Sequence, residues 1–252
     1  FSLSATLTFS QDKPLEISGS ADLYYKYDFS KTANIPTSFA SDQNSVSLGM
    51  VDIVLKKKTG KTSFVAEISF GPRGAGQSIP DVNGQSYHIQ NLYATYEASE
   101  KLTLTAGYMS TFIGYEVISP VSNFHYSTSY LFTNGPFQNG GVKANYTFSK
   151  KVGLMVGLFN DQWNAHQANS SLGLNAVGAQ LSLSPSEKLT AYVNYLVIND
   201  GAIIHGYTFE VNKKLEETDE DIIGYVLPEM RERFDSLSKE VLISVDIDLK
   251  ID

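Results

Sequence analysis

The chain has 252 residues, of which 42% are hydrophobic and 12% aromatic, and its formal net charge is −8. The acidic balance argues against a nucleic-acid partner, because binding to phosphates requires a basic surface. The absence of cysteine excludes disulfides and thiolate metal sites, and no apolar run approaches the roughly 18 residues of a membrane helix.

Residues 15–30 alternate between apolar and polar side chains without interruption, as a two-faced β-strand does. This segment is longer than the roughly 9–11 residues that a tilted strand needs to cross a bilayer. Its apolar face ends in Tyr25, Tyr27 and Phe29, and aromatic residues in this position are typical of a membrane–water interface. The pattern predicts a membrane-spanning strand. We expect Phe1 to follow a cleaved signal peptide.

Similar alternation predicts further strands along the chain. The regular ones are expected at residues 1–9, 64–70, 91–98, 102–108, 142–148, 152–158, 177–183 and 189–195. In residues 46–56 the apolar phase shifts between Met50 and Val51, which predicts a β-bulge or an irregular strand. Residues 203–211 and 241–251 are two more strand candidates. Residues 213–240 are acidic and are expected to be partly helical, with the helix packed on the barrel or on its own loop or, less favoured, bound to a partner.

The connections between the predicted strands alternate in length. Short ones lie at residues 57–61, 99–101, 149–151 and 184–188, and long ones at 31–44, 71–88, 111–140 and 160–173. This is the layout of outer-membrane barrels. The sequence predicts one all-β domain over residues 1–252, an antiparallel up-and-down transmembrane β-barrel of about 12 strands (roughly 10–14) with long loops on one side. A soluble sandwich or lipocalin-like barrel is the alternative, but small polar residues would give it a poor solubilising surface.

Several segments together resemble the OmpL-like β-barrel porin family of Bacteroidota outer membranes. They are residues 18–28, 48–55, 64–73, 114–120, 123–126, 130–137 and 157–161. The resemblance implies a porin of the bacterial outer membrane without catalytic residues, and it fades after about Asn199. We therefore expect a passive channel for small hydrophilic solutes, in contact with outer-membrane lipid. The alternative is a non-conducting structural or accessory barrel with protein partners in a larger envelope complex.

The alternation and the longest connection supply the candidate site residues. Ionisable residues expected to line the lumen are Glu16, Asp22, Lys26, Glu67, Glu97 and Lys143. The aromatic-rich connection at residues 111–140 either folds into the lumen as a constriction loop or covers the barrel mouth. Its candidates are Tyr115, Glu116, Phe124, His125, Tyr126, Tyr130, Phe132 and Phe137.

Enzyme signals are weak, because no nucleophile elbow, phosphate loop or HExxH pair is present. Asp161 and His166 could meet at a loop rim, as an acid–histidine pair of a membrane-barrel hydrolase would. We nevertheless expect no enzyme, no cofactor and no metal.

Overall fold

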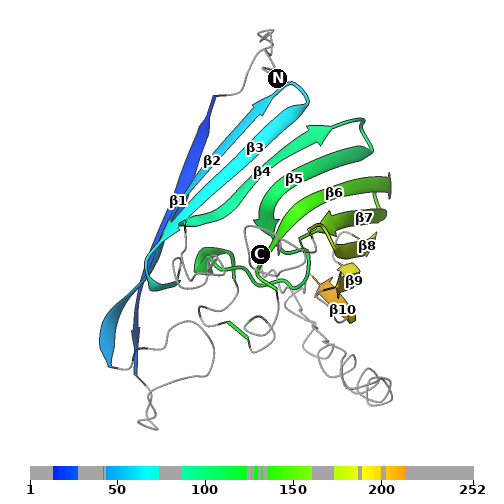
Figure 1. Cartoon of the computed structure of the whole chain (residues 1–252). Helices are drawn as coiled ribbons and strands as arrows, with labels where there is room; N and C mark the ends of the chain where they lie inside the picture. The colour runs from blue at the N-terminus through cyan, green and yellow to red at the C-terminus, as the bar shows by residue number, and fades with distance from the viewer. Residues whose placement is uncertain are drawn as a thin grey trace, which may run out of the picture.

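The computed structural model describes residues 14–27, 42, 44–73, 87–123, 126, 128–129, 132, 136–160, 173–186, 189–199 and 203–213. They form one antiparallel sheet of ten strands, in which spatial neighbours follow the chain order from β1 to β10 (Figure 1). The strands are β1 (Glu16–Lys26), β2 (Ser45–Thr59), β3 (Thr62–Phe70), β4 (Ile89–Glu97), β5 (Leu102–Ser110), β6 (Gln138–Ser149), β7 (Val152–Phe159), β8 (Ala176–Ser186), β9 (Leu189–Asn199) and β10 (Ile203–Lys213). The predicted all-β, antiparallel up-and-down order is therefore confirmed.

The described sheet is open. Within the described ranges no pairing joins β1 to β10, so the predicted closed barrel is not formed by these ten strands. The strands predicted at residues 1–9 and 241–251, and the partly helical segment at 213–240, lie outside the described residues. Among those that are described, no helix has the length and apolarity needed to span a membrane.

The side chains are distributed in the opposite way to those of a soluble β-protein. Large apolar residues such as Ile17, Leu23 and Val46 are 66–77% exposed, whereas Asp52 and Asn194 are at most 6% exposed. A soluble sheet buries its apolar face, while a membrane barrel turns an apolar band outward to the lipid. This distribution weighs against the soluble alternative. β1 has 11 residues, enough to cross a bilayer at a tilt.

The connections alternate between short and long, as predicted, over most of the sheet. β2–β3, β4–β5, β6–β7 and β8–β9 are joined by short turns, and β1–β2, β3–β4, β5–β6 and β7–β8 by long connections. In the β2–β3 turn, Gly60 has a φ of 58°, a conformation that favours glycine. The exception is β9–β10, which only residues 200–202 separate at the end where the other connections are long.

The irregularity predicted in the second strand is a β-bulge. In the pairing with β1, Ala21 faces Val51 and Leu23 faces Leu48, so Gly49 and Met50 together stand opposite Asp22. The amide N–H of Met50 donates a hydrogen bond of 2.8 Å to Asp22 Oδ1. A Cβ on Gly49 would lie 1.6 Å from Asp22 Oδ2, so any other residue here would displace the Asp22 carboxylate from its present position.

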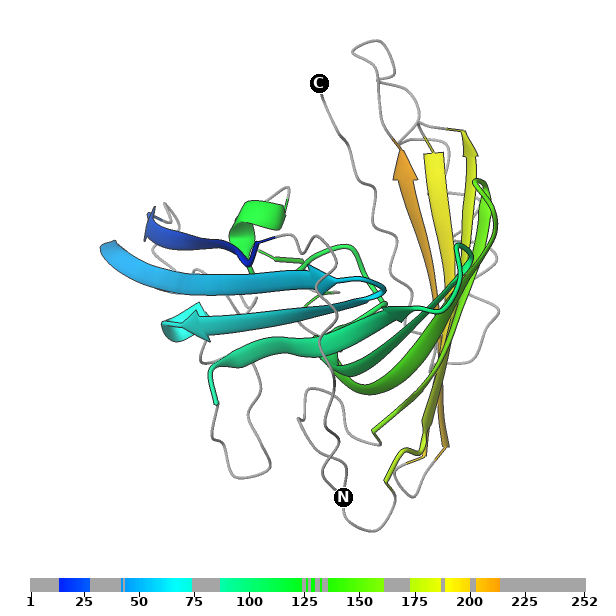
Figure 2. The ribbon, with the colours of Figure 1, turned by 90° about the horizontal axis from the view of Figure 1, so that it is seen from above.

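The sheet is strongly bent. Figure 2 shows β1–β4 and the later strands as two arms, with the chain around the short 3-10 helix η1 (Pro120–Ser122) on the concave side. The described residues of the connection between β5 and β6, which are 111–123, 126, 128–129, 132 and 136–137, thus lie against the inner face of the sheet. We call this connection the inward segment.

Candidate lumen site

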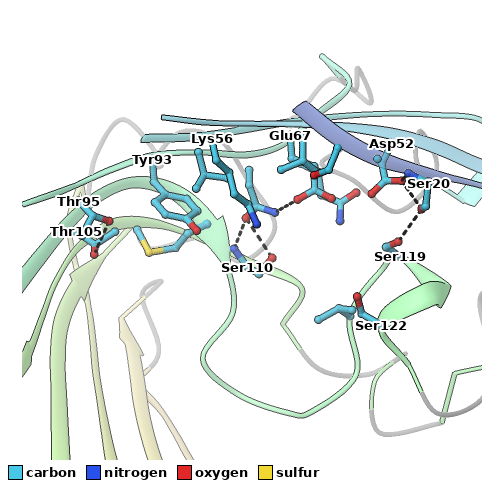
Figure 3. A pocket seen from close by; sticks show the side chains of 18 of the residues that line it. Ser20, Asp52, Lys56, Glu67, Tyr93, Thr95, Thr105, Ser110, Ser119 and Ser122 are labelled. Carbon is cyan, nitrogen blue, oxygen red and sulfur yellow. Dashed lines mark hydrogen bonds between the residues drawn. The ribbon is translucent and has the colours of Figure 1, made fainter. Parts of the chain in front are cut away.

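The inner face of the sheet and the inward segment line a partly open polar cavity of about 640 Å³ (Figure 3). Residues from β1 to β6 form its wall, and Val117, Ser119 and Ser122 of the inward segment line the opposite side. Charged side chains at the wall are Asp52, Lys56, Glu67 and Lys143. A cavity with hydroxyls, amides and charges of both signs can hold water and a small hydrophilic solute.

Hydrogen bonds between neighbouring strands hold two of the cavity's carboxylates. Asp52 Oδ1 accepts a hydrogen bond of 2.7 Å from the amide N–H of Ser20 and a short one from its hydroxyl. Glu67 Oε2 accepts a hydrogen bond of 2.6 Å from Asn91 Nδ2. Asn91 Oδ1 in turn accepts a hydrogen bond of 2.7 Å from the amide N–H of Ser110. These bonds fix the polar wall along β1–β5, because buried polar groups are stable only when they are paired.

The inward segment is anchored to the β1–β3 side of the sheet by charged groups. The hydroxyl of Tyr126 donates a hydrogen bond of 2.5 Å to Asp22 Oδ2. Arg73, which follows β3, donates from Nε to Ile118 O at 2.7 Å and from Nη1 to Tyr126 O at 3.0 Å. Its guanidinium also lies 5.1 Å from the centre of the Tyr126 ring. Burial and the bond to Asp22 raise the pKa of the Tyr126 hydroxyl, and burial lowers the pKa of Arg73.

The start of the same segment is anchored on the opposite arm. Phe112 stacks on Phe159 of β7 with ring centres 5.6 Å apart, and Ile113 is buried in a cluster with Phe159 and Leu196 of β9. Gln180 of β8 donates a hydrogen bond of 2.7 Å to Phe112 O. The described part of the segment therefore crosses the concave face from β7–β9 to β1–β3.

The predicted lumen residues occupy different places. Glu67 and Lys143 line the cavity. Asp22 instead lies beneath the inward segment, where it accepts the hydrogen bond from Tyr126. The other three predicted residues, Glu16, Lys26 and Glu97, are not among the residues that line this cavity. Glu97 instead accepts a hydrogen bond of 2.5 Å from Lys58, close to the short turns.

The predicted constriction residues are also divided. Tyr126 meets Asp22, and Phe132 and Phe137 pack with Met50 and Ile118 in a second apolar cluster. Glu116 accepts a hydrogen bond of 2.9 Å from the amide N–H of Ser129, inside the segment itself. Tyr115 is half-buried. Phe124, His125 and Tyr130 lie outside the described residues.

Sequence reasoning missed three of the anchoring residues. Arg73 stands in a Gly-Pro-Arg segment just after β3, and Phe112 lies two residues after β5 ends at Ser110. Gln180 is a long polar side chain on a strand face where its neighbours, Gly178 and Ser182, are small. This difference in size could have marked Gln180 as a contact residue in the sequence. Asp161 and His166 lie outside the described residues, and the described part of the chain contains no group of three candidate metal ligands.

Two comparisons with known proteins cover different shares of the chain. UvrABC system protein C of Flavobacterium johnsoniae is 45% identical over 64 residues, which are 25% of this chain and 11% of that protein. The same protein of Bacteroides fragilis strain YCH46 is 40% identical over 70 residues, 28% of this chain and 12% of that protein. The matched part thus spans about a tenth of these curated relatives. A far longer match, over residues 14–221, is to the family described as "Putative beta-barrel porin-2, OmpL-like". The chain belongs to this family of OmpL-like β-barrel porins.

Proposed function

We propose that the protein is an outer-membrane channel for the passive diffusion of small hydrophilic solutes. The observation that carries the proposal is the reversed distribution of side chains, with apolar residues exposed on the outer face and polar residues buried on the inner face. The outer face suits contact with lipid acyl chains. The polar cavity of about 640 Å³ suits hydrated solutes, and family membership supports both assignments.

In this proposal the inward segment sets the width of the path. It crosses the concave face and is fixed on both arms of the sheet, by Phe112 on Phe159 and by Tyr126 on Asp22. A loop held at two sides by packing and hydrogen bonds narrows a lumen without closing it, as long as water-filled space remains beside it. That space is the cavity bounded by Ser119 and the β1–β6 wall.

Single-channel recording in planar lipid bilayers tests the proposal. We expect the purified, folded protein to give discrete, ohmic conductance steps. The substitution Arg73→Met removes the two hydrogen bonds to the segment carbonyls of Ile118 and Tyr126 and is expected to increase the conductance. Arg73→Lys keeps the charge but not the forked donor, and it should give an intermediate value. A folded wild-type protein that does not conduct would rule out the channel.

A non-conducting accessory barrel is the second candidate. It is favoured by the extent to which the inward segment is packed, with apolar clusters around Ile113 and around Ile118. Such packing is also what a plug requires. This candidate predicts no conductance in wild type or in Arg73→Met, together with a protein partner that is retained on gentle detergent extraction.

A further inference from the structure

Two lysines line the lumen cavity, and their surroundings differ. Lys56 of β2 lies directly opposite Glu16 of β1, and on β3 it is a diagonal neighbour of Glu67, which pairs with Val54. Cross-strand neighbours at these positions are within reach of long side chains. Lys56 therefore stands among carboxylates of its own chain.

The positive charge of Lys143 of β6 has no carboxylate at the neighbouring cross-strand positions. Its cross-strand neighbours on β5 and β7 carry no carboxylate; they are Thr103, Thr105, Gly107, Met155, Gly157 and Phe159. The side chain is half-buried, and within the described part of the chain it makes no hydrogen bond or ion pair. A partly desolvated ammonium without a counter-ion is unfavourable, so this position is costly for the sheet alone.

The polar groups beside Lys143 are neutral. Thr105 stands directly opposite it and lies 3.3 Å from Thr95, hydroxyl to hydroxyl, and Asn145 also lines the cavity. Gly157, directly opposite on the other side, adds no polar or charged side chain, and the apolar ring of Phe159 lies over it. One positive charge with hydroxyl and amide donors around it matches one negatively charged oxygen group.

We infer that Lys143 contacts the solute in the lumen cavity and binds the carboxylate of a small organic monoanion. The inference rests on the proposed channel function. A carboxylate fits better than a phosphate dianion, because Asp52 and Glu67 on the β2–β3 wall repel a second negative charge. Both carboxylates are already hydrogen-bonded to Ser20 and Asn91, which leaves the β6 side as the positive side of the cavity.

Protection from amine labelling tests binding independently of conduction. Purified barrel in lipid vesicles is treated with an acetylating reagent, and the modification of each lysine is followed by mass spectrometry. Propionate is expected to slow the labelling of Lys143 and not that of Lys56, while phosphate at equal ionic strength gives less protection. Equal protection of both lysines, no protection by propionate, or better protection by phosphate would each overturn the inference. Because labelling needs no current, a silent channel would refute only the proposed function.

Ion selectivity supplies the second readout. We expect Lys143→Gln to lower the ratio of propionate to potassium permeability about fivefold, the factor for two unit charges about 4 Å apart in water. Lys143→Arg should keep the wild-type ratio. Lys56→Gln is the matched control, since it removes the same charge from the same cavity. An equal effect of Lys56→Gln and Lys143→Gln would show that both lysines act only through the overall electrostatic potential of the cavity, and it would contradict a binding site at Lys143.

Discussion

The contact between Tyr126 and Asp22 is the most direct test of how the inward segment is held. Tyr126→Phe removes one hydroxyl and keeps the ring. The ring retains its neighbours, Tyr24 at 5.6 Å between ring centres and the Arg73 guanidinium at 5.1 Å. The substitution therefore isolates the 2.5 Å hydrogen bond to Asp22 Oδ2.

The expected magnitude follows from the two bonds that Asp22 accepts. A hydrogen bond to a charged group contributes about 1.5–3 kcal/mol to stability. After Tyr126→Phe, Asp22 still accepts the 2.8 Å bond from the Met50 amide, so the carboxylate is not left without a donor. We therefore expect a loss near the lower end, about 1.5–2 kcal/mol. A loss of that size raises the fraction of molecules with a detached segment about tenfold or more.

A double-mutant cycle measures this energy. The free energy of unfolding from lipid vesicles is determined for wild type, Tyr126→Phe, Asp22→Ala and the double variant, with hydrogen exchange at residues 118–126 as a local readout. We expect a coupling energy of about 1.5 kcal/mol and faster exchange in both single variants. Tyr25→Phe is the control, because the exposed Tyr25 hydroxyl also donates at 2.8 Å, to Asn44, and should cost about 0.5 kcal/mol. A coupling energy no larger than the control loss would refute the anchoring role.

Three further predictions concern the wall, the core and pH. Ile53→Arg places a charge on the outward face of β2, where Ile53 is 42% exposed. It should lower the free energy of unfolding from a bilayer by about 2–4 kcal/mol. Val54→Arg, at the next residue, which faces the cavity, should lower it clearly less. Phe159→Ala removes a side chain that is 1% exposed and should cost about 3–5 kcal/mol in the same assay. Because the folded pKa of Tyr126 is raised, the contribution of its hydrogen bond to stability should be fully present below the unfolded value of about 10 and lost only above it. The protection factors at residues 118–126, which correct for the pH dependence of intrinsic amide exchange, should therefore not change between about pH 6 and 9.

Much of the wall could be predicted from the sequence because strand geometry is local. Alternation of period two located the described strands and the outward direction of Leu23 and Tyr25. The phase shift at Met50 located the bulge, since one extra residue must reverse the faces. The sequence did not predict that the connection between β9 and β10 is short at the end where the other connections are long, although the strand at 203–211 was itself predicted.

The site could be predicted only in part, because its contacts join residues far apart in the chain. Tyr126 and Asp22 are 104 positions apart, and the hydroxyls of Ser119 and Ser20, 3.3 Å apart in space, are separated by 99. No local pattern encodes such a pairing. Alternation also indicates which face of the sheet a residue occupies, but it does not indicate how far along the strand direction that residue lies from the cavity. That is why Glu67 lines the cavity while Glu97, on the same face of the next strand, pairs with Lys58 near the turns.

The bulge in β2 and the inward segment depend on each other. Without the extra residue, Met50 would share the phase of Leu48, which is 66% exposed on the outer face. The bulge turns Met50 inward to 2% exposure, where it packs with Ile118, Phe132 and Phe137 of the segment. On the opposite arm, Met155, Phe159 and Leu196 are inward apolar residues on otherwise polar or small faces, and they receive Phe112 and Ile113. Apolar residues on a lumen face are unfavourable when they contact water, so these positions make physical sense only with the segment docked. The inner face of the sheet therefore carries two apolar binding places for the inward segment.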